Sequence, residues 1–421
     1  MTLTTLPRKA LVAAALATCF SAAHATNGYF AHGYGVKAQG MGGAAVAMTD
    51  NAFAGANNPA TAAFAGNRWD LGATVFSPRR SVSRGDAGPF GGAFSVDSDK
   101  EFFLIPEFGY NVALSNKIGL NLTVYGNGGM NTEYPTVSAL NGSNSLYGTG
   151  KLGVDLMQLI VAPTFAYKFT DNSAIGVSPL LVYQRFKAYG LQAFAAAPPN
   201  GYGATSLAEN NGTDSSTGFG VRVGYMAKLN DKVNFGMAYS PKVDMKEFDK
   251  YRELFAEKGD FDIPENYSVG LAIQATPTVV LALDYQRINY SGVASVSNPS
   301  TNQAALGASN GPGFGWKDIN VYKLGVQWQK DSTWTLRAGY NRGENPISSR
   351  DVTFNILAPG VMKDHYTFGA TMALNKTDEI SFFGMYAPEV EVSGTSLLVP
   401  GVRETIRMNQ YSGGIQFSRK F

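Results

Sequence analysis

Runs in which apolar side chains alternate with small or polar ones recur through most of this chain. Examples are residues 118–124, 219–225, 233–239, 267–273, 322–328 and 366–372. A period of two places the apolar side chains on one face of a β-strand. Soluble sandwiches alternate in the same way, but their strands usually have roughly five or six residues. The runs here lie in segments of about ten residues, the length of a tilted membrane-crossing strand.

The connections between these segments alternate between short and long. Six short polar turns are expected, at residues 115–116, 170–172, 230–231, 276–277, 330–332 and 375–378. Seven long connections are expected between them, at about 78–101, 127–150, 187–216, 244–265, 291–315, 343–364 and 388–405. Short turns on one side and long loops on the other are typical of outer-membrane barrels. The sequence therefore predicts an all-β fold, a transmembrane antiparallel β-barrel of about fourteen strands over residues 67–421.

Aromatic residues support a barrel with lipid around it. Tyr167, Phe169, Trp328 and Trp334 stand beside expected short turns, where an aromatic girdle lies in such barrels; ordinary strand packing is the alternative. The final strand alternates up to Phe421, and an aromatic carboxy-terminal residue resembles the signal read by the barrel-assembly machinery.

Residues 1–25 read as a secretory signal peptide. Arg8 and Lys9 precede an apolar run that ends at Phe20, and Ala23-His24-Ala25 supplies small residues for cleavage. Residues 16–19 loosely resemble a lipoprotein cleavage box, but Thr18 and Phe20 fit it poorly. The residues that follow contain no apolar stretch of 18, so no transmembrane helix is expected.

Composition excludes several classes of function. Cys19 is the only cysteine and leaves with the signal, which excludes disulfides and thiolate metal sites. Subtracting Arg8 and Lys9 from 34 basic residues leaves 32, equal to the 32 acidic residues. This neutral balance argues against nucleic acid as a partner.

Residues 26–66 break the alternation and are rich in glycine, alanine and asparagine. A barrel of this width needs a filled lumen unless it is a water channel, so this segment is expected to be a plug. It contains Thr26-Asn27-Gly28-Tyr29-Phe30, Gly33-Tyr34-Gly35, Gly40-Met41-Gly42-Gly43-Ala44 and Asn58-Pro59-Ala60. These motifs resemble the start of FadL-type outer-membrane transport proteins (OmpP1/FadL/TodX), which carry long-chain fatty acids or aromatic hydrocarbons.

The resemblance implies a location in the outer membrane of a Gram-negative bacterium and a hydrophobic small molecule as ligand. It implies that residues 26–66 form a hatch containing Tyr29, Phe30, Asn58, Pro59 and Ala60. It further implies capture of the solute by the third and fourth loops, binding in the lumen, and lateral release beside a kinked third strand. Membrane lipid and lipopolysaccharide are the expected surroundings, a monomer is the expected state, and no cofactor is expected.

Glycines mark where the third strand is expected to bend. Its alternation continues through Tyr125 and then meets Gly126, Gly128 and Gly129. Glycine within a strand commonly marks a bulge or bend, which would open the wall there. The alternative is that these glycines only begin the next loop.

Two long loops carry apolar residues for solute capture. Residues 246–258 place Phe248, Tyr251, Leu254 and Phe255 at helical spacing, which predicts an amphipathic helix with an exposed apolar patch. The loop that faces it carries Leu191, Phe194 and residues 195–197. The alternative is that the two loops simply pack on each other.

Inward-facing basic residues are candidates for binding a carboxylate. Strand parity places Arg222, Lys323 and Arg337 inward, and Arg185 on the lipid side unless a bulge resets it. Lys323 and Arg185 look similar in placement to the carboxylate-binding basic residues of the family. The alternative is that inward basic residues pair with acids such as Asp155, Glu107 or those of the hatch.

Nothing in the sequence indicates an enzyme. His32 and His365 stand neither in metal-binding spacing nor in a serine-hydrolase signature. The sequence therefore predicts passive uptake of hydrophobic compounds, with fatty acids ahead of monoaromatic hydrocarbons because of the inward basic residues. A general porin and a surface adhesin are the alternatives from other classes.

Overall fold

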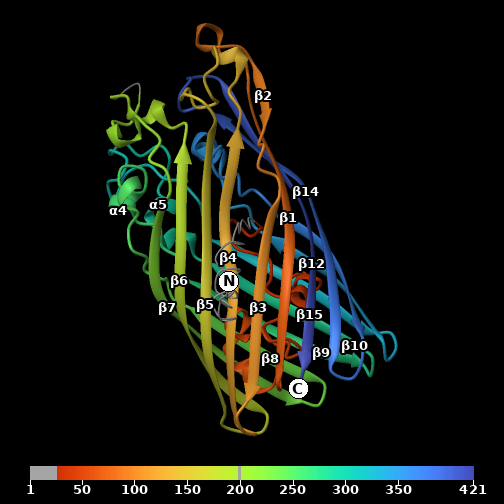
Figure 1. Ribbon diagram of the computed structural model, residues 1–421. Helices are drawn as coiled ribbons and strands as arrows, with labels where there is room; N and C mark the ends of the chain where they lie inside the picture. Colours follow the sequence, from red (N-terminus) through yellow and green to blue (C-terminus); the bar gives the residue numbers. More distant parts are fainter. Residues whose placement is uncertain (1–25, 198–200) are drawn as a thin grey trace, which may run out of the picture.

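The computed structural model describes residues 26–197 and 201–421, so the expected signal peptide lies outside the described residues. In this part of the chain, fifteen strands form one antiparallel sheet. Fourteen of them close into a barrel when the last strand, β15, pairs with β1 (Figure 1). The remaining strand, β2, pairs only with the outer end of β1. The predicted barrel of fourteen strands is confirmed.

Each strand pairs with its neighbours in chain order, apart from the short β2. The strands are β1 (Arg68–Arg84), β2 (Phe94–Asp97), β3 (Phe103–Ala113), β4 (Ile118–Tyr134), β5 (Leu152–Lys168), β6 (Ser173–Tyr189), β7 (Asp214–Asn230), β8 (Val233–Ser240), β9 (Asn266–Thr276), β10 (Val279–Ile288), β11 (Ile319–Gln329), β12 (Trp334–Gly343), β13 (Asp364–Ala373), β14 (Asp378–Thr395) and β15 (Arg403–Lys420).

All six expected short turns lie where the sequence predicts them, between β3 and β4, β5 and β6, β7 and β8, β9 and β10, β11 and β12, and β13 and β14. The expected long connections are partly wrong, because the three at 78–101, 127–150 and 388–405 were expected to begin too early. The strands β1, β4 and β14 continue to Arg84, Tyr134 and Thr395. The outward-facing side chains of these outer parts are polar, among them Arg79, Ser81, Glu133, Glu389 and Glu391, so the apolar outer face stops while the backbone pairing continues.

Strand length shows how far the wall reaches beyond the lipid. β4, β5, β6 and β7 have 17 residues each, whereas the neighbouring β3 has 11. At a rise of about 3.3 Å per residue, 17 residues span roughly 56 Å, whereas the hydrocarbon layer is about 30 Å thick. On the other side of the barrel, β8 to β13 have 8 to 11 residues and lie more steeply inclined (Figure 1).

Two rows of aromatic side chains mark the outer surface. Near the short turns, Tyr167, Phe169 and Trp328 are exposed on the wall. A second row, made of tyrosines, lies toward the long loops and was not predicted from the sequence. Its members are paired directly across neighbouring strands: Tyr340 with Tyr366, Tyr366 with Tyr386, and Tyr386 with Tyr411. Two aromatic belts at different heights are expected where a barrel meets both membrane surfaces.

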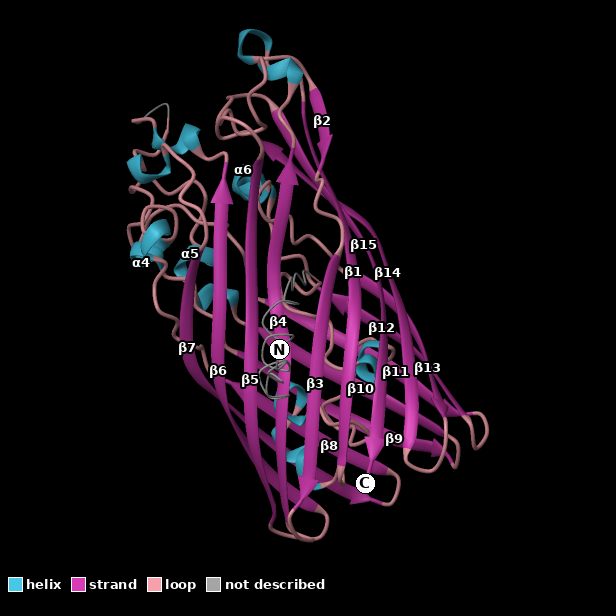
Figure 2. Ribbon diagram, in the orientation of Figure 1, coloured by secondary structure: helices cyan, strands magenta, loops and turns pink. Residues whose placement is uncertain are grey.

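Short helical turns occupy the lumen and the long loops (Figure 2). They are α2 (Val36–Gln39), α3 (Ala54–Asn57), η1 (Pro59–Ala63), η2 (Gly88–Phe90), η3 (Ser138–Leu140), η4 (Gln192–Ala195), η5 (Thr205–Leu207), η6 (Asp249–Tyr251), α4 (Ala256–Gly259), η7 (Tyr290–Gly292), α5 (Ala294–Ser297), η8 (Ser349–Asp351) and α6 (Val352–Asn355). Among the described residues, no helix is long and apolar enough to cross a membrane.

Candidate functional site

Residues 26–66 lie within the barrel and are held by side chains from the inner wall. The amides of Ala45 and Val46 donate to the Asp284 carboxylate at 2.7 and 3.0 Å. The Ala52 amide donates to Asp70 at 2.6 Å. Gly35 likewise donates to Glu107 at 3.1 Å, and Val36 to Gln416 at 3.1 Å. Because buried backbone groups need partners, wall side chains replace the hydrogen bonds that this irregular segment does not make internally.

Glycines on the inner wall allow the segment to approach the strands closely. At several of them, an added Cβ would overlap backbone atoms of residues 29–62. They are Gly109, Gly119, Gly128, Gly176, Gly236 and Gly339, distributed over β3, β4, β6, β8 and β12. This close contact therefore explains part of the glycine enrichment of the chain.

Asn58-Pro59-Ala60 anchors the segment against β6 and β7. The Asn58 side-chain amide donates to the Val46 carbonyl at 2.8 Å and to the Tyr225 carbonyl of β7 at 3.0 Å. Its oxygen accepts the Ala60 amide at 3.1 Å, which begins η1. Pro59 packs on Gly176 of β6. The tripeptide therefore ties one turn of the segment both to itself and to the wall.

Tyr29 and Phe30 meet an aromatic cluster below the long loops. The Tyr29 ring lies 5.5 Å from Tyr290, 5.9 Å from Phe261 and 5.9 Å from Trp316, measured between centroids. The Tyr290 hydroxyl donates to the Asn27 carbonyl at 2.6 Å. All these rings are buried, so aromatic side chains line the inside of the barrel at this level.

Arg222 and Lys323 face the lumen, as their strand parity predicts. Both border a cavity of about 30 Å³ between residues 30–57 and the strands β7 to β11. Arg222 donates to the carbonyls of Ala56 and Gly55 and to the Tyr125 hydroxyl, the last two at 3.4 Å. Among the described residues, neither cation forms an ion pair, although Asp284 is paired in register with Lys323 on the neighbouring strand.

The other two candidate cations have acidic partners. Arg337 lies 3.5 Å from Asp50. Arg185 lies on the outer face of β6, 3.7 Å from Asp155. No register shift interrupts the pairing of β6 with β5, so no bulge turns Arg185 inward. Arg185 therefore lies on the outer surface, as its strand parity predicts, and not in the lumen with Lys323.

The expected amphipathic helix over residues 246–258 is also wrong. The segment forms only η6 and the four-residue α4, in which Glu257 and Lys258 have positive φ. Phe248, Tyr251, Leu254 and Phe255 are buried rather than exposed. The Phe186 ring of β6 lies 5.8, 4.7 and 4.7 Å from Phe248, Tyr251 and Phe255. The apolar residues whose spacing predicted a helix belong instead to an irregular loop and point into its core.

The loop after β6 packs into the same core and is hydrogen-bonded to the loop after β8, Ser206 N–H to Glu253 at 2.8 Å. Its Phe194 ring stacks on Phe354 of α6 with centroids 5.4 Å apart, and its Leu191 is buried in the same large apolar core as Phe248. The two loops therefore share one core with α6 and residues 290–316, rather than forming an exposed groove.

Charged groups fasten the loop after β8. Asp262 accepts the Met245 amide at 2.7 Å and pairs with Lys242. Burial, together with the Asp262 carboxylate, raises the pKa of Asp260 to about 8. A protonated Asp260 avoids repulsion from Asp262 and lets the loop pack closely over the barrel.

The third barrel strand, β4, bends at the expected glycines. The register with β5 shifts between Gly126 and Gly128, which makes Asn127 the bulged residue. The backbone of Tyr29 and Ala31 bonds to β4 there, Gly129 N–H to Tyr29 at 3.2 Å and Ala31 N–H to Asn127 at 3.3 Å. Gly128 is required because any side chain would overlap the Tyr29 carbonyl.

The bend separates β4 from β3. Their ladder ends at the pair Phe108 and Val124, although β3 begins at Phe103 and β4 continues to Tyr134. Contact resumes farther out, where Asp99 N–H donates to the Glu133 carbonyl at 2.7 Å. The wall thus has one interrupted stretch with pairing below it and a backbone contact above it.

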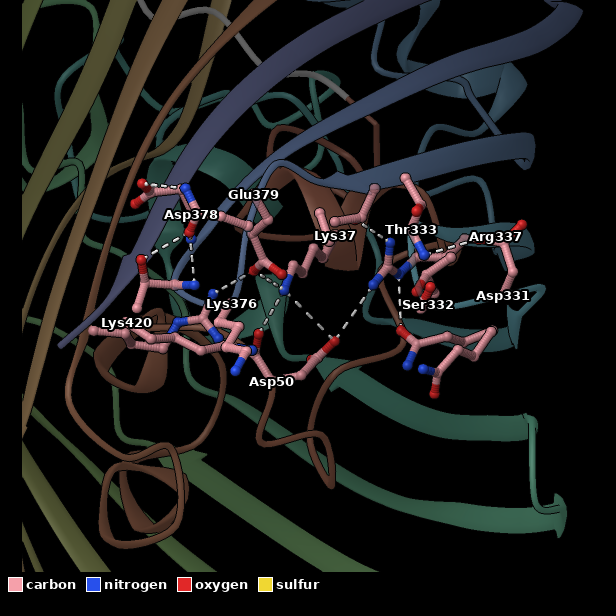
Figure 3. A pocket seen from close by; sticks show the side chains of 18 of the residues that line it. Lys37, Asp50, Asp331, Ser332, Thr333, Arg337, Lys376, Asp378, Glu379 and Lys420 are labelled. Atoms are coloured by element: carbon pink, nitrogen blue, oxygen red, sulfur yellow. Dashed lines mark hydrogen bonds and ion pairs between the residues drawn. The ribbon is translucent and has the colours of Figure 1, made fainter.

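A polar cavity of about 520 Å³ opens at the short-turn end (Figure 3). Lys37 and Asp50 of the lumen segment point into it beside Arg337 and Glu379 of the wall (Figure 3). The Lys37 ammonium lies 2.6 Å from Glu379 and 4.0 Å from Asp50, and Arg68 pairs with both Asp70 and Glu379 at 2.8 and 2.9 Å. This network joins the segment electrostatically to β1, β12 and β14.

The structure brings together two histidines that are far apart in the sequence. The rings of His32 and His365 are buried and stacked, with centroids 6.1 Å apart and an interplanar angle of 8°. The described residues contain no group of three or more His, Cys, Asp or Glu that could hold a metal ion. Only the fold reveals this pair, because no spacing in the sequence links the two positions.

The barrel is closed and antiparallel, and two aromatic belts encircle it. Residues that precede the first strand occupy its bore. These features together define the class of outer-membrane transport proteins. Comparison with known families identifies which one. Residues 12–393 match the family described as outer membrane protein transport protein (OMPP1/FadL/TodX). The chain belongs to this family, which comprises transport proteins rather than enzymes, and its place is the outer membrane of a Gram-negative cell.

Solved structures show the same fold. The toluene transporter TodX of P. putida aligns with a TM-score of 0.68 and 19% identity, over 93% of this chain and 99% of that one. The toluene transporter TbuX of Ralstonia pickettii gives 0.64 and 20% over the same shares. A Pseudomonas aeruginosa FadL homologue gives 0.67 and 14%, again over 93% and 99%. No curated protein sequence matches the chain.

Proposed function

We propose that this protein is a passive channel for hydrophobic compounds and that long-chain fatty acids are its main substrates. The solute enters between the long extracellular loops, binds in the lumen beside the N-terminal segment, and leaves sideways where β4 separates from β3. In this proposal residues 26–66 act as a hatch that closes the bore to water.

The structure supports a different first step from the one that sequence favours. Phe248, Tyr251, Leu254 and Phe255 are buried, so they do not present a ready surface patch. We expect the loops to part transiently and to expose this aromatic core to the solute. An apolar lining gives a greasy molecule contacts that a water-filled pore lacks.

The observation that carries the choice of fatty acids is the pair of cations in the lumen. Arg222 and Lys323 border the same small cavity and have no ion-pair partner among the described residues. Asp284 lies opposite Lys323 but accepts the amides of Ala45 and Val46 instead of forming an ion pair with it. A lumen cation without an ion pair costs free energy, and a bound carboxylate would offset that cost. The apolar rings above the cavity would contact the hydrocarbon chain.

Uptake assays in a strain that lacks its own fatty-acid transporter test this proposal. The full-length protein should raise uptake of labelled oleate above the empty vector. Lys323→Met should lower oleate uptake about tenfold, the scale of one lost charged hydrogen bond. Lys187→Met, a control on the exposed face of β6, should leave it unchanged. Oleate uptake equal to the empty vector would remove fatty acids as substrates.

Monoaromatic hydrocarbons are the second candidate. The aromatic cluster of Tyr29, Phe30, Tyr290 and Trp316 suits a flat apolar ring, and structures of similar fold are described as toluene transporters. Toluene uptake in the same strains separates the two, because toluene does not need Lys323. Full toluene uptake without oleate uptake would favour this second candidate.

The surroundings of the barrel follow from the same proposal. The outer tyrosine row would contact the lipopolysaccharide leaflet, and Phe421, which is exposed at the carboxy terminus, would be read by the barrel-assembly machinery. A single chain closes the barrel by itself, so we propose that a monomer is functional.

A further inference from the structure

Arg80 lies at the point where β1 changes partners. Below it, β1 pairs with β3 as far as Phe76 and Phe103. Above it, β1 pairs with β2 from Ser81 onward. The alternation of burial along β1 turns Arg80 toward the inside of the wall, beside the outer edge of the interruption between β3 and β4.

Two of the three guanidinium nitrogens of Arg80 are buried without a hydrogen-bond partner within the described residues. The residue is 5% exposed, and its Nε and Nη2 atoms make no hydrogen bond within the described residues. The guanidinium lies over the Phe103 ring, 5.8 Å from Cζ to the centroid. Arg84, four residues farther on the same face, instead donates twice to Glu404.

The acids near Arg80 pair with other groups or face outward, as Asp97 does opposite Ser81. Glu101 pairs with Arg79, the outward-facing neighbour of Arg80. Glu133 accepts from Lys151 at 2.9 Å and from Tyr189 at 3.0 Å. A buried cation that lacks a counter-charge is costly, so an anion from outside the chain would stabilise this position.

Tyr134 supplies a second group at the same place. It is fully buried on β4, and its hydroxyl has no hydrogen-bond partner within the described residues. Ser98 joins the two strands here, because its N–H donates to the Arg80 carbonyl at 2.9 Å and its Oγ accepts the N–H of Glu133, the residue before Tyr134, at 3.0 Å. A separate apolar cluster continues inward from Phe103 and includes Phe76, Ile105 and Met385. Two unused donors therefore stand at the end of an apolar surface.

We propose that Arg80 and the Tyr134 hydroxyl bind the carboxylate of an amphiphilic acid at the outer edge of the β3–β4 interruption, with its hydrocarbon chain along Phe76, Phe103 and Ile105. This site is separate from the cavity beside Arg222 and Lys323. It rests on the proposed function, and it gives the interruption a preference for acids over neutral hydrocarbons.

The test compares an acid with its neutral analogue. The full-length protein in detergent is titrated with cis-parinaric acid and with its methyl ester, and binding is followed by fluorescence. Arg80→Met should weaken binding of the acid about tenfold and leave the ester unchanged. Tyr134→Phe should weaken the acid by a smaller factor. Arg79→Met, which removes an adjacent but outward-facing arginine, should change neither.

The outcomes separate this inference from the proposed function. Arg80→Met removes an unpaired charge, so the unfolding temperature of this variant should be at least that of the wild type. Heat-modified migration on gels measures it. If Arg80→Met binds the acid as tightly as wild type, or loses acid and ester equally, the inference is wrong while the channel stands. If wild type binds neither probe, the proposed fatty-acid function fails.

Discussion

At the residue scale, the inner wall is shaped by what lies against it. Strand parity predicts correctly that Arg222 and Lys323 face inward and that Arg185 faces outward. A place for Arg185 in the lumen would have required a bulge in β6, and the pairing of β6 with β5 has none. Glycine enrichment predicts a barrel wall but not which glycines touch the N-terminal segment, because that contact joins residues far apart in the sequence. Arg80 was missed because it fell within an expected loop.

Gly128→Ala tests this close contact. The added methyl group would overlap the Tyr29 carbonyl, and overpacking of this kind costs about 1–3 kcal/mol. We expect a lower unfolding temperature, measured by heat-modified migration on gels. Gly72→Ala is the matched control, because a Cβ on that inward-facing glycine of β1 would meet its nearest atom at 3.5 Å. Equal behaviour of the two variants would contradict the account of the wall glycines.

At the scale of elements, the sequence predicts strands and turns better than loops. Six turns are located correctly because short polar interruptions between alternating runs have few other interpretations. The helix expected over residues 246–258 is absent, since apolar residues three or four apart also suit an irregular loop whose side chains point into one core. The upper ends of β1, β4 and β14 escaped prediction because their outward-facing side chains are polar, so the apolar outer face by which the other strands are recognised ends there.

The N-terminal segment behaves as one element fastened at a few points, of which Asn58 is the most connected. Asn58→Ala removes two donated hydrogen bonds and one accepted one. Asn58→Asp keeps the acceptor but turns a carboxylate toward two carbonyl oxygens. We expect each variant to lower the free energy of unfolding by roughly 1–3 kcal/mol for each group left unpaired. This loss should appear as a lower unfolding temperature.

The neighbouring residue provides the control for this comparison. Asn57 donates a single hydrogen bond, to the Tyr34 carbonyl at 3.1 Å, so Asn57→Ala should have the smaller effect. An Asn58→Asp variant as stable as the wild type would show that the donated hydrogen bonds do not hold the segment in place.

At the scale of the whole molecule, the barrel and its contents form one unit. Wall carboxylates, glycines and the ion pairs around Lys37 all engage residues 26–66, and the extracellular loops pack over the same lumen. The sequence predicted a plug in a barrel from the break in alternation. It did not predict that residues 29–31 contact the bend of β4, because that contact depends on the completed wall.

Conductance of the purified full-length protein in planar lipid bilayers tests the closed bore most directly. With residues 26–66 fastened inside the barrel, we predict no steady ion current above that of the bare bilayer, although the protein has inserted. A steady, ohmic current through single inserted molecules would show an open aqueous pore. It would contradict the account and favour a general porin.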